Sequence, residues 1–132
     1  MANQIMAPIS VGELYDKISI LEIKRERIED AAKMKNISFE LELLNTIASA
    51  LPSPNGDIAM FRDKLKEVNG RIWDLEERVR ALGVAKNYGE EFISVARLIH
   101  EMNDTRASIK KVLNVKSNSE VVEEKSYSLP KN

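Results

Sequence analysis

Two arginines, Arg25 and Arg106, are the residues of this chain whose positions point most directly to chemistry. Each stands where the apolar repeat of an amphipathic helix requires a hydrophobic side chain. A guanidinium does not lose its charge on burial, so an arginine in a helical core needs a partner. We therefore expect Arg25 and Arg106 to share one polar site inside a helical bundle, where they bind a carboxylate or phosphate.

Polar neighbours of the two arginines complete this candidate anion site. Lys24 precedes one arginine, and Asn103 and Lys110 lie on the same helical segment as the other. The alternative is purely structural: each arginine forms a salt bridge to a nearby carboxylate such as Glu22 or Asp104. Replacing a whole buried ion pair by apolar groups is often neutral, so the two interpretations predict different results when both partners are removed.

Known catalytic motifs do not occur in the sequence. It contains no glycine-rich phosphate loop, no His-Glu-x-x-His and no Gly-x-Ser-x-Gly. His100 and Asp104 are one helical turn apart, but a bundle di-metal site needs Glu three residues before the histidine, and this chain has Arg97 there. We expect no metal site and no cofactor, and the sequence leaves open whether the protein is an enzyme.

Four other side chains are candidates for a protein interface. Trp73 is the only tryptophan and is the centre of a polar row on one helix flank, formed with Asn69, Glu76 and Arg80. The first helical segment carries Tyr15, Ile20 and Ile23 away from its main apolar spine, so it is apolar on more than one side. This extra surface predicts a homodimer. The alternative is a monomer in which residues 121–129 fold back over it.

Helices must position all of these residues, and the sequence marks where they begin and end. A Ser10-x-x-Glu13 capping box opens the first helix, and a phase slip at residues 34–36 separates it from a shorter second one. The Pro- and Gly-rich run at 52–56 predicts a loop, and Gly83 predicts a left-handed cap after the third helix. The expected helices are Val11 to Lys33, Ser38 to Leu51, Asp57 to Leu82 and Tyr88 to Asn114.

These segments predict an all-α fold. The expected architecture is an antiparallel helical bundle of three long helices and one short helix, with an extended C-terminal arm. Residues 1–132 would form a single helical domain, with the bundle core at 9–114 and the arm or tail at 115–132. The third and fourth segments keep a seven-residue apolar repeat, which is typical of coiled-coil packing.

Composition excludes several classes of function. The 132 residues suit one domain, and 31% charged residues without a long apolar run exclude a membrane span. The net charge of -1 makes nucleic acid an unlikely partner, and the absence of cysteine excludes disulfides and thiolate sites. The N-terminal residues lack the charged and apolar regions of a secretory signal, which predicts a cytoplasmic protein.

Four stretches of the sequence resemble a small bacterial and bacteriophage family of helical proteins of unknown function. They are residues 8–24, 89–93, 103–110 and 122–127, so the resemblance covers nearly the whole chain. It implies that the tail up to Tyr127 belongs to the domain. It implies no activity and no binding residue.

Two functions remain open from the sequence. The favoured hypothesis is a non-catalytic interaction or assembly module, which is a homodimer and has a possible protein partner. The alternative is a small helical enzyme or ligand binder that recognises a carboxylate or phosphate anion through arginines in the bundle interior.

Overall fold

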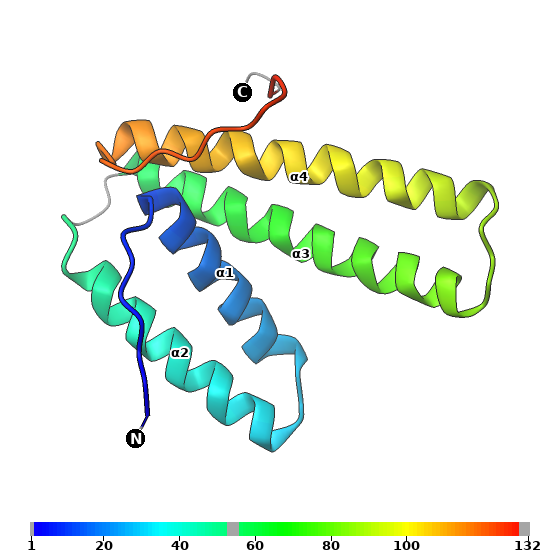
Figure 1. Cartoon of the computed structure of the whole chain (residues 1–132), viewed down its shortest axis with the longest axis horizontal. Helices are drawn as coiled ribbons and strands as arrows, with labels where there is room; N and C mark the ends of the chain where they lie inside the picture. The colour runs from blue at the N-terminus through cyan, green and yellow to red at the C-terminus, as the bar shows by residue number, and fades with distance from the viewer. Residues whose placement is uncertain (1, 53–55, 130–132) are drawn as a thin grey trace.

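The chain folds into two helical hairpins that pack against each other, as a computed structural model shows for residues 2–52 and 56–129 (Figure 1). The first hairpin is α1 (Val11–Arg27) and α2 (Ala31–Ser49), and the second is α3 (Gly56–Val84) and α4 (Glu90–Lys116). The two helices of each hairpin run antiparallel, and α1 lies against one end of the α3/α4 pair. The predicted all-α helical bundle is confirmed, and the described residues contain no strand.

The start of α1 is fixed by its cap, as the sequence predicts. Ser10 is the N-cap, and its Oγ accepts a hydrogen bond from the backbone N–H of Glu13 at 3.0 Å. The next two N–H groups donate to residues far away in the sequence. The N–H of Val11 donates to Ser119 Oγ (3.1 Å), and the N–H of Gly12 donates to Asn114 Oδ1 (2.7 Å). The C-terminal end of α4 therefore satisfies the open N-terminus of α1.

The junction between the first two helices lies earlier than predicted. The expected bounds of Val11 to Lys33 and Ser38 to Leu51 are wrong, because the chain leaves the helix at Ile28, whose φ and ψ are -93° and 133°. Asp30 then caps α2, and its carboxylate accepts the Lys33 N–H at 2.9 Å. The bundle therefore has two long helices, of 29 and 27 residues, and two shorter ones, of 17 and 19.

The long helices match their predicted bounds to within two residues at each end, but the cap of α3 differs. The helix continues through Gly83, and Lys86 takes the left-handed conformation with φ of 56°. Lys86 N–H donates to the Gly83 carbonyl (3.0 Å) and Asn87 N–H to that of Leu82 (2.8 Å), which is a Schellman motif. Of the loop predicted at 52–56, residues 53–55 lie outside the described residues, and Gly56 is already the first residue of α3.

The apolar core lies where α1 packs on the α3/α4 hairpin. Leu65 of α3 and Leu113 of α4 are completely buried there, and Ile18 of α1 packs in the same cluster. At 1.5 Å per residue α3 is about 43 Å long and α1 about 26 Å. Because α1 is shorter, the turn end of the α3/α4 hairpin extends beyond it (Figure 1).

The C-terminal arm folds back over α4. Asn118, with φ of 54°, reverses the chain after the helix, and Ser119 N–H donates to the Asn114 carbonyl at 2.8 Å. Irregular chain then runs along α4 (Figure 1). The alternative expectation, that residues 121–129 cover the second apolar side of α1, is wrong, because the arm packs over α4 and helices cover that side instead.

Candidate functional site

The structure separates the two arginines that we expected to meet. Arg25 is exposed and lines a groove between α1 and α2, beside Glu42 and Asn45. Arg106 is half-buried on α4 and lines clefts that Arg25 does not reach. Lys24 is half-buried on α1 and lines none of these clefts. Arg25 escapes the core because α1 ends two residues later, so the shared arginine site is not formed.

Arg106 instead belongs to a buried hydrogen-bonded network that joins three helices, here called the polar centre. Its members are Asp16 and Ser19 of α1, Asn69 of α3, and Asn103 and Arg106 of α4. Asn69 Nδ2 donates to Asp16 Oδ1 (2.8 Å) and to Ser19 Oγ (2.7 Å). Arg106 Nη1 donates to Asn69 Oδ1 (3.3 Å), and its Nη2 donates to Asn103 Oδ1 (2.7 Å). The network fixes how α1 sits on α3 and α4.

The two charged members of the polar centre, Asp16 and Arg106, do not form an ion pair with each other. Arg106 donates only to two neutral amides, and no carboxylate of residues 2–52 or 56–129 lies within ion-pair distance of it. Asp16, which is buried, has Lys110 Nζ at 3.7 Å from its second oxygen. The guanidinium of Arg106 therefore keeps its charge without a direct counter-ion.

Lys110, the other cation of this region, is surrounded by carboxylates. Its nearly buried Nζ lies 2.5 Å from Glu13 Oε2, 3.7 Å from Asp16 and 3.7 Å from Glu123 Oε1 of the arm. Lys125 also contacts Glu123 at 3.2 Å, and its hydrogen bond, with the charge of Lys110, holds the pKa of the Glu123 carboxyl below its ordinary value. Lys110 was a predicted anion ligand, but here it anchors α1 and the arm to α4.

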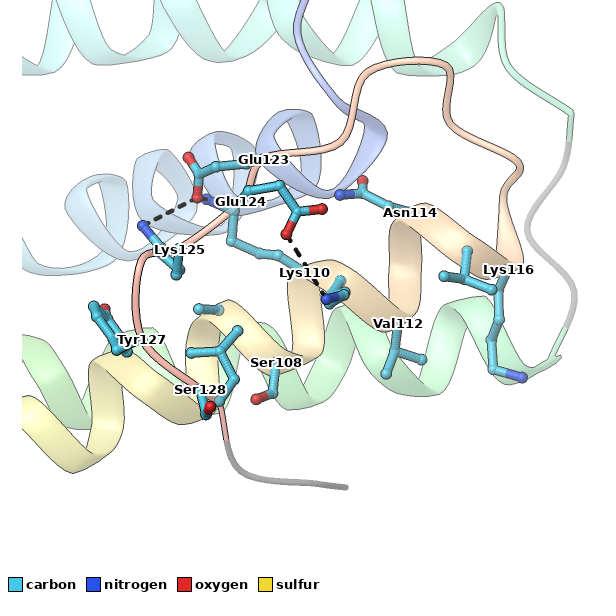
Figure 2. A pocket seen from close by; sticks show the side chains of 14 residues that line it. Ser108, Lys110, Val112, Asn114, Lys116, Glu123, Glu124, Lys125, Tyr127 and Ser128 are labelled. Carbon is cyan, nitrogen blue, oxygen red and sulfur yellow. Dashed lines mark ion pairs between the residues drawn. The ribbon is translucent and has the colours of Figure 1, made fainter.

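The arm and α4 enclose two neighbouring clefts of about 500 and 570 Å³. Figure 2 shows the arm carrying Glu123, Glu124 and Lys125 over α4, with one ion pair inside the arm, between Lys125 and Glu123, and another from Glu124 to Lys111 of α4. His100 and Asp104 line the second cleft, but the described ranges hold no group of three or more His, Asp or Glu side chains placed to bind a metal. Lys110 and Lys125, which line the clefts, both form ion pairs with carboxylates of the chain itself.

A third cleft, here called the Trp73 groove, opens beside the polar centre between α1, α3 and α4. It has a volume of about 290 Å³. Ile20, Ile72 and Trp73 give it apolar walls, and the remaining lining side chains are polar or charged: Asn69, Glu76, Glu77, Arg80 and Arg106. The polar row that the sequence marks around Trp73 therefore lines one groove, together with Ile20.

The other two predicted interface residues are inside the molecule. Tyr15 is 4% exposed and Ile23 is 3% exposed. The guanidinium of Arg62 on α3 lies 4.3 Å from the centre of the Tyr15 ring. Because α2 covers one side of α1 while α3 and α4 cover another, neither Tyr15 nor Ile23 is accessible to a partner.

A stripe of exposed apolar side chains lies on α2, and sequence reasoning missed it. Phe39, Leu43 and Ile47 form a stripe at four-residue spacing and are 60%, 37% and 48% exposed. Ile37 and Leu41 on the opposite face of the helix are buried against α1. The four-residue spacing is present in the sequence, and testing this segment for two apolar faces rather than one would have revealed the stripe.

A protein-family comparison decides where this chain belongs. The model of a family of unknown function, DUF6165, matches residues 5–132. The chain belongs to this family. The match includes the C-terminal arm, as the resemblance implied. No curated protein and no solved structure matches the chain.

Three of the four segments that carry the resemblance come together in the structure. They supply the polar centre and its surroundings: residues 8–24 supply Asp16 and Ser19, residues 103–110 supply Arg106, and residues 122–127 supply Glu123. These segments lie at one end of the molecule although they are far apart in the sequence (Figure 1). None of the described helices is long and apolar enough to cross a membrane.

Proposed function

We propose that this DUF6165 protein is a non-catalytic interaction and assembly module that acts as a homodimer, with the α2 stripe as the dimer contact. The observation that carries the proposal is the stripe of Phe39, Leu43 and Ile47, which is solvent-exposed on an ordered helix. Exposed apolar side chains gathered on one face mark interaction sites far more often than the same residues scattered singly.

The position of α2 in the fold supports this proposal. Within the described chain α2 packs along α1 and makes no comparable contact with α3 or α4. Its inner face, with Ile37 and Leu41, is buried, so the stripe gives it a second apolar face. A helix that is apolar on two sides is typically covered on both. A partner is therefore expected on the outer side.

The symmetry of the stripe favours a second copy as that partner. In an antiparallel α2–α2 contact centred on Leu43, Phe39 of each copy faces Ile47 of the other. The same pairing places Glu40 opposite Thr46, so no like charges meet. A two-fold contact requires such a self-complementary surface, and two-fold dimers are the commonest homo-oligomers.

The dimer is tested by measuring the mass of the full chain in solution with light scattering. At tens of micromolar protein we expect twice 14.9 kDa. Leu43→Glu should give the monomer mass, because two carboxylates would face each other at the two-fold axis, while circular dichroism remains helical. Ile93→Glu is the matched control: Ile93 is 56% exposed on α4, and its replacement should leave the dimer intact.

Two outcomes would refute the proposal. One is a monomeric wild-type protein, and the other is a dimer that Ile93→Glu dissociates while Leu43→Glu does not. The sequence-based argument for a dimer rested on Tyr15, Ile20 and Ile23, so this proposal keeps the oligomeric state and moves the contact to α2. A cytoplasmic location and a bacterial or phage source, both expected from the sequence, complete the proposal.

A further inference from the structure

We propose that the Trp73 groove binds a small amphipathic carboxylate, whose anionic group pairs with Arg106 and whose apolar body packs on Trp73, Ile20 and Ile72. The proposal concerns a different surface from the α2 stripe and does not depend on dimerisation. It rests on two features that meet in one groove: a half-buried cation with which no carboxylate of the described residues forms an ion pair, and an apolar wall beside it.

The cation is held in place and still has donors to offer. Arg106 donates one hydrogen bond from Nη1 to Asn69 and one from Nη2 to Asn103, which leaves three of its five N–H groups. The two amide oxygens fix the plane of the guanidinium between α3 and α4 but do not neutralise it. A planar carboxylate matches this fork and would supply the missing charge.

The carboxylates that line the groove do not supply that charge. Glu76 forms an ion pair with Arg80, with 3.7 Å between Oε2 and Nε. Glu77 is exposed to solvent and accepts the indole N–H of Trp73 at 2.9 Å. Neither lies within ion-pair distance of Arg106, so an anion entering from outside is the partner that this guanidinium lacks.

The walls of the groove determine the rest of the ligand. Ile20 and Ile72 are aliphatic, and the face of Trp73 gives a flat, polarizable surface. A volume of about 290 Å³ is at the lower end of the range for small-molecule sites. A single ring or a short alkyl chain with one carboxylate fits this space.

The neighbouring clefts between α4 and the arm are a weaker site for an amphipathic anion, because Ile20, Ile72 and Trp73 do not line them, although Arg106 also lines the second one. Their lysines, Lys110 and Lys125, already pair with carboxylates of this chain. An anion that paired with either lysine there would have to displace Glu13 or Glu123. At the Trp73 groove the charge of Arg106 is not paired, so binding there does not break an internal ion pair.

Trp73 itself provides the measurement, because it is the only tryptophan. The fluorescence of the full-length protein is titrated with 3-phenylpropanoate, which combines a ring and a carboxylate. The controls are acetate, which lacks the apolar ring, and 3-phenylpropanamide, which lacks the negative charge. We expect a saturable change in Trp73 emission with 3-phenylpropanoate and affinities weaker by about tenfold or more for both controls.

Variants assign the binding to Arg106. Arg106→Gln keeps a polar side chain but removes the charge, and it should weaken 3-phenylpropanoate binding by about tenfold or more. Arg97→Gln is the matched control, because Arg97 is an exposed arginine of the same helix that does not line the Trp73 groove or the arm clefts, so affinity should be unchanged. Thermal unfolding followed by circular dichroism checks that both variants fold.

A second measurement on the wild-type protein covers the case in which Arg106→Gln does not fold. The Nε–Hε resonance of Arg106 should shift in an NMR titration with 3-phenylpropanoate and should not shift with 3-phenylpropanamide. The proposal is overturned if 3-phenylpropanoate gives no saturable signal, if the amide binds equally well, if folded Arg106→Gln binds normally, or if the Arg106 resonance does not move.

Discussion

The two ends of the α3/α4 hairpin carry the same apolar repeat but differ in how much of it is buried. At the proximal end, where α1 packs, Leu65 and Leu113 are completely buried. At the distal end, Leu82 and Val95 next to the turn are buried, but Leu75, Val79 and Ile99 at equivalent repeat positions are only half-buried. A third helix makes the difference, since two helices alone cover one side of each seam residue.

The ends also differ in their polar interactions. The proximal end contains the polar centre, whose residues Asp16, Ser19 and Asn69 are buried and hydrogen-bonded. The distal end is joined by an exposed pair, in which Arg78 donates to both oxygens of Glu91 at 2.8 and 2.6 Å. Water screens such a surface pair, so its contribution to stability is small. The proximal end therefore concentrates the stability and the specificity of the fold.

The largest expected effect comes from removing a core leucine at each end. Leu113→Ala should lower the free energy of unfolding by about 3 to 4 kcal/mol, because it leaves a cavity among three helices. Leu75→Ala should cost about 1 to 2 kcal/mol, because the half-buried site opens to water. Urea unfolding followed by circular dichroism measures both. Equal losses of unfolding free energy in the two variants would mean that a further protein surface covers the distal end in solution.

A pair of glycine substitutions tests the closest helix contact of the proximal end. A Cβ on Gly12 would lie 2.6 Å from the Lys110 carbonyl oxygen and 2.9 Å from Asn114 Oδ1, so Gly12→Ala should cost about 1 to 3 kcal/mol. Gly83→Ala at the distal end meets nothing within 4 Å and should gain about 0.5 kcal/mol from helix propensity. Thermal unfolding compares them, and a stable Gly12→Ala protein would contradict the close contact.

The cap of α3 offers a gain in stability at the distal end. Lys86 has φ of 56°, a conformation that costs a residue with a Cβ about 1 kcal/mol relative to glycine. Lys86→Gly should therefore raise the free energy of unfolding by about that amount. Ala81→Gly, inside the helix, is the control and should lower it by about 1 kcal/mol. A loss of stability in Lys86→Gly would show that the Schellman motif does not form.

The smallest expected effect is a pH dependence at the distal ion pair. The hydrogen bond from Arg78 holds the pKa of the Glu91 carboxyl below its ordinary value of 4.5. A carboxyl whose pKa is lower in the folded state stabilises the protein above its unfolded pKa and loses this contribution as the pH falls. Glu91→Gln should thus be slightly less stable than wild type at pH 7, and the difference should vanish in acid and shrink in high salt. A difference that does not vary with pH would contradict the pair.

The sequence alone predicted the helices and most of their ends. Ser10 marks the start of α1 by its side-chain chemistry, and the heptad repeat of α3 and α4 is long enough to identify both helices. These features are local, so they are readable without a fold. The junction at Ile28 was missed because Asp30 was not recognised as a cap, and the phase slip at residues 34–36 lies inside α2.

Only the tertiary structure decided which unusual residues share a site. Arg25 and Arg106 interrupt their helix patterns in the same way, yet one is exposed at the end of α1 and the other bonds to Asn69 inside the bundle. Periodicity gives the face of a helix on which a residue lies but not what covers that face. The crossing of α1 over α3 and α4, which the contact at Gly12 and the polar centre determine, depends on residues about a hundred positions apart. For that reason the sequence identified Arg106 as exceptional, and the packing of three helices placed its guanidinium beside Asn69 and Asn103.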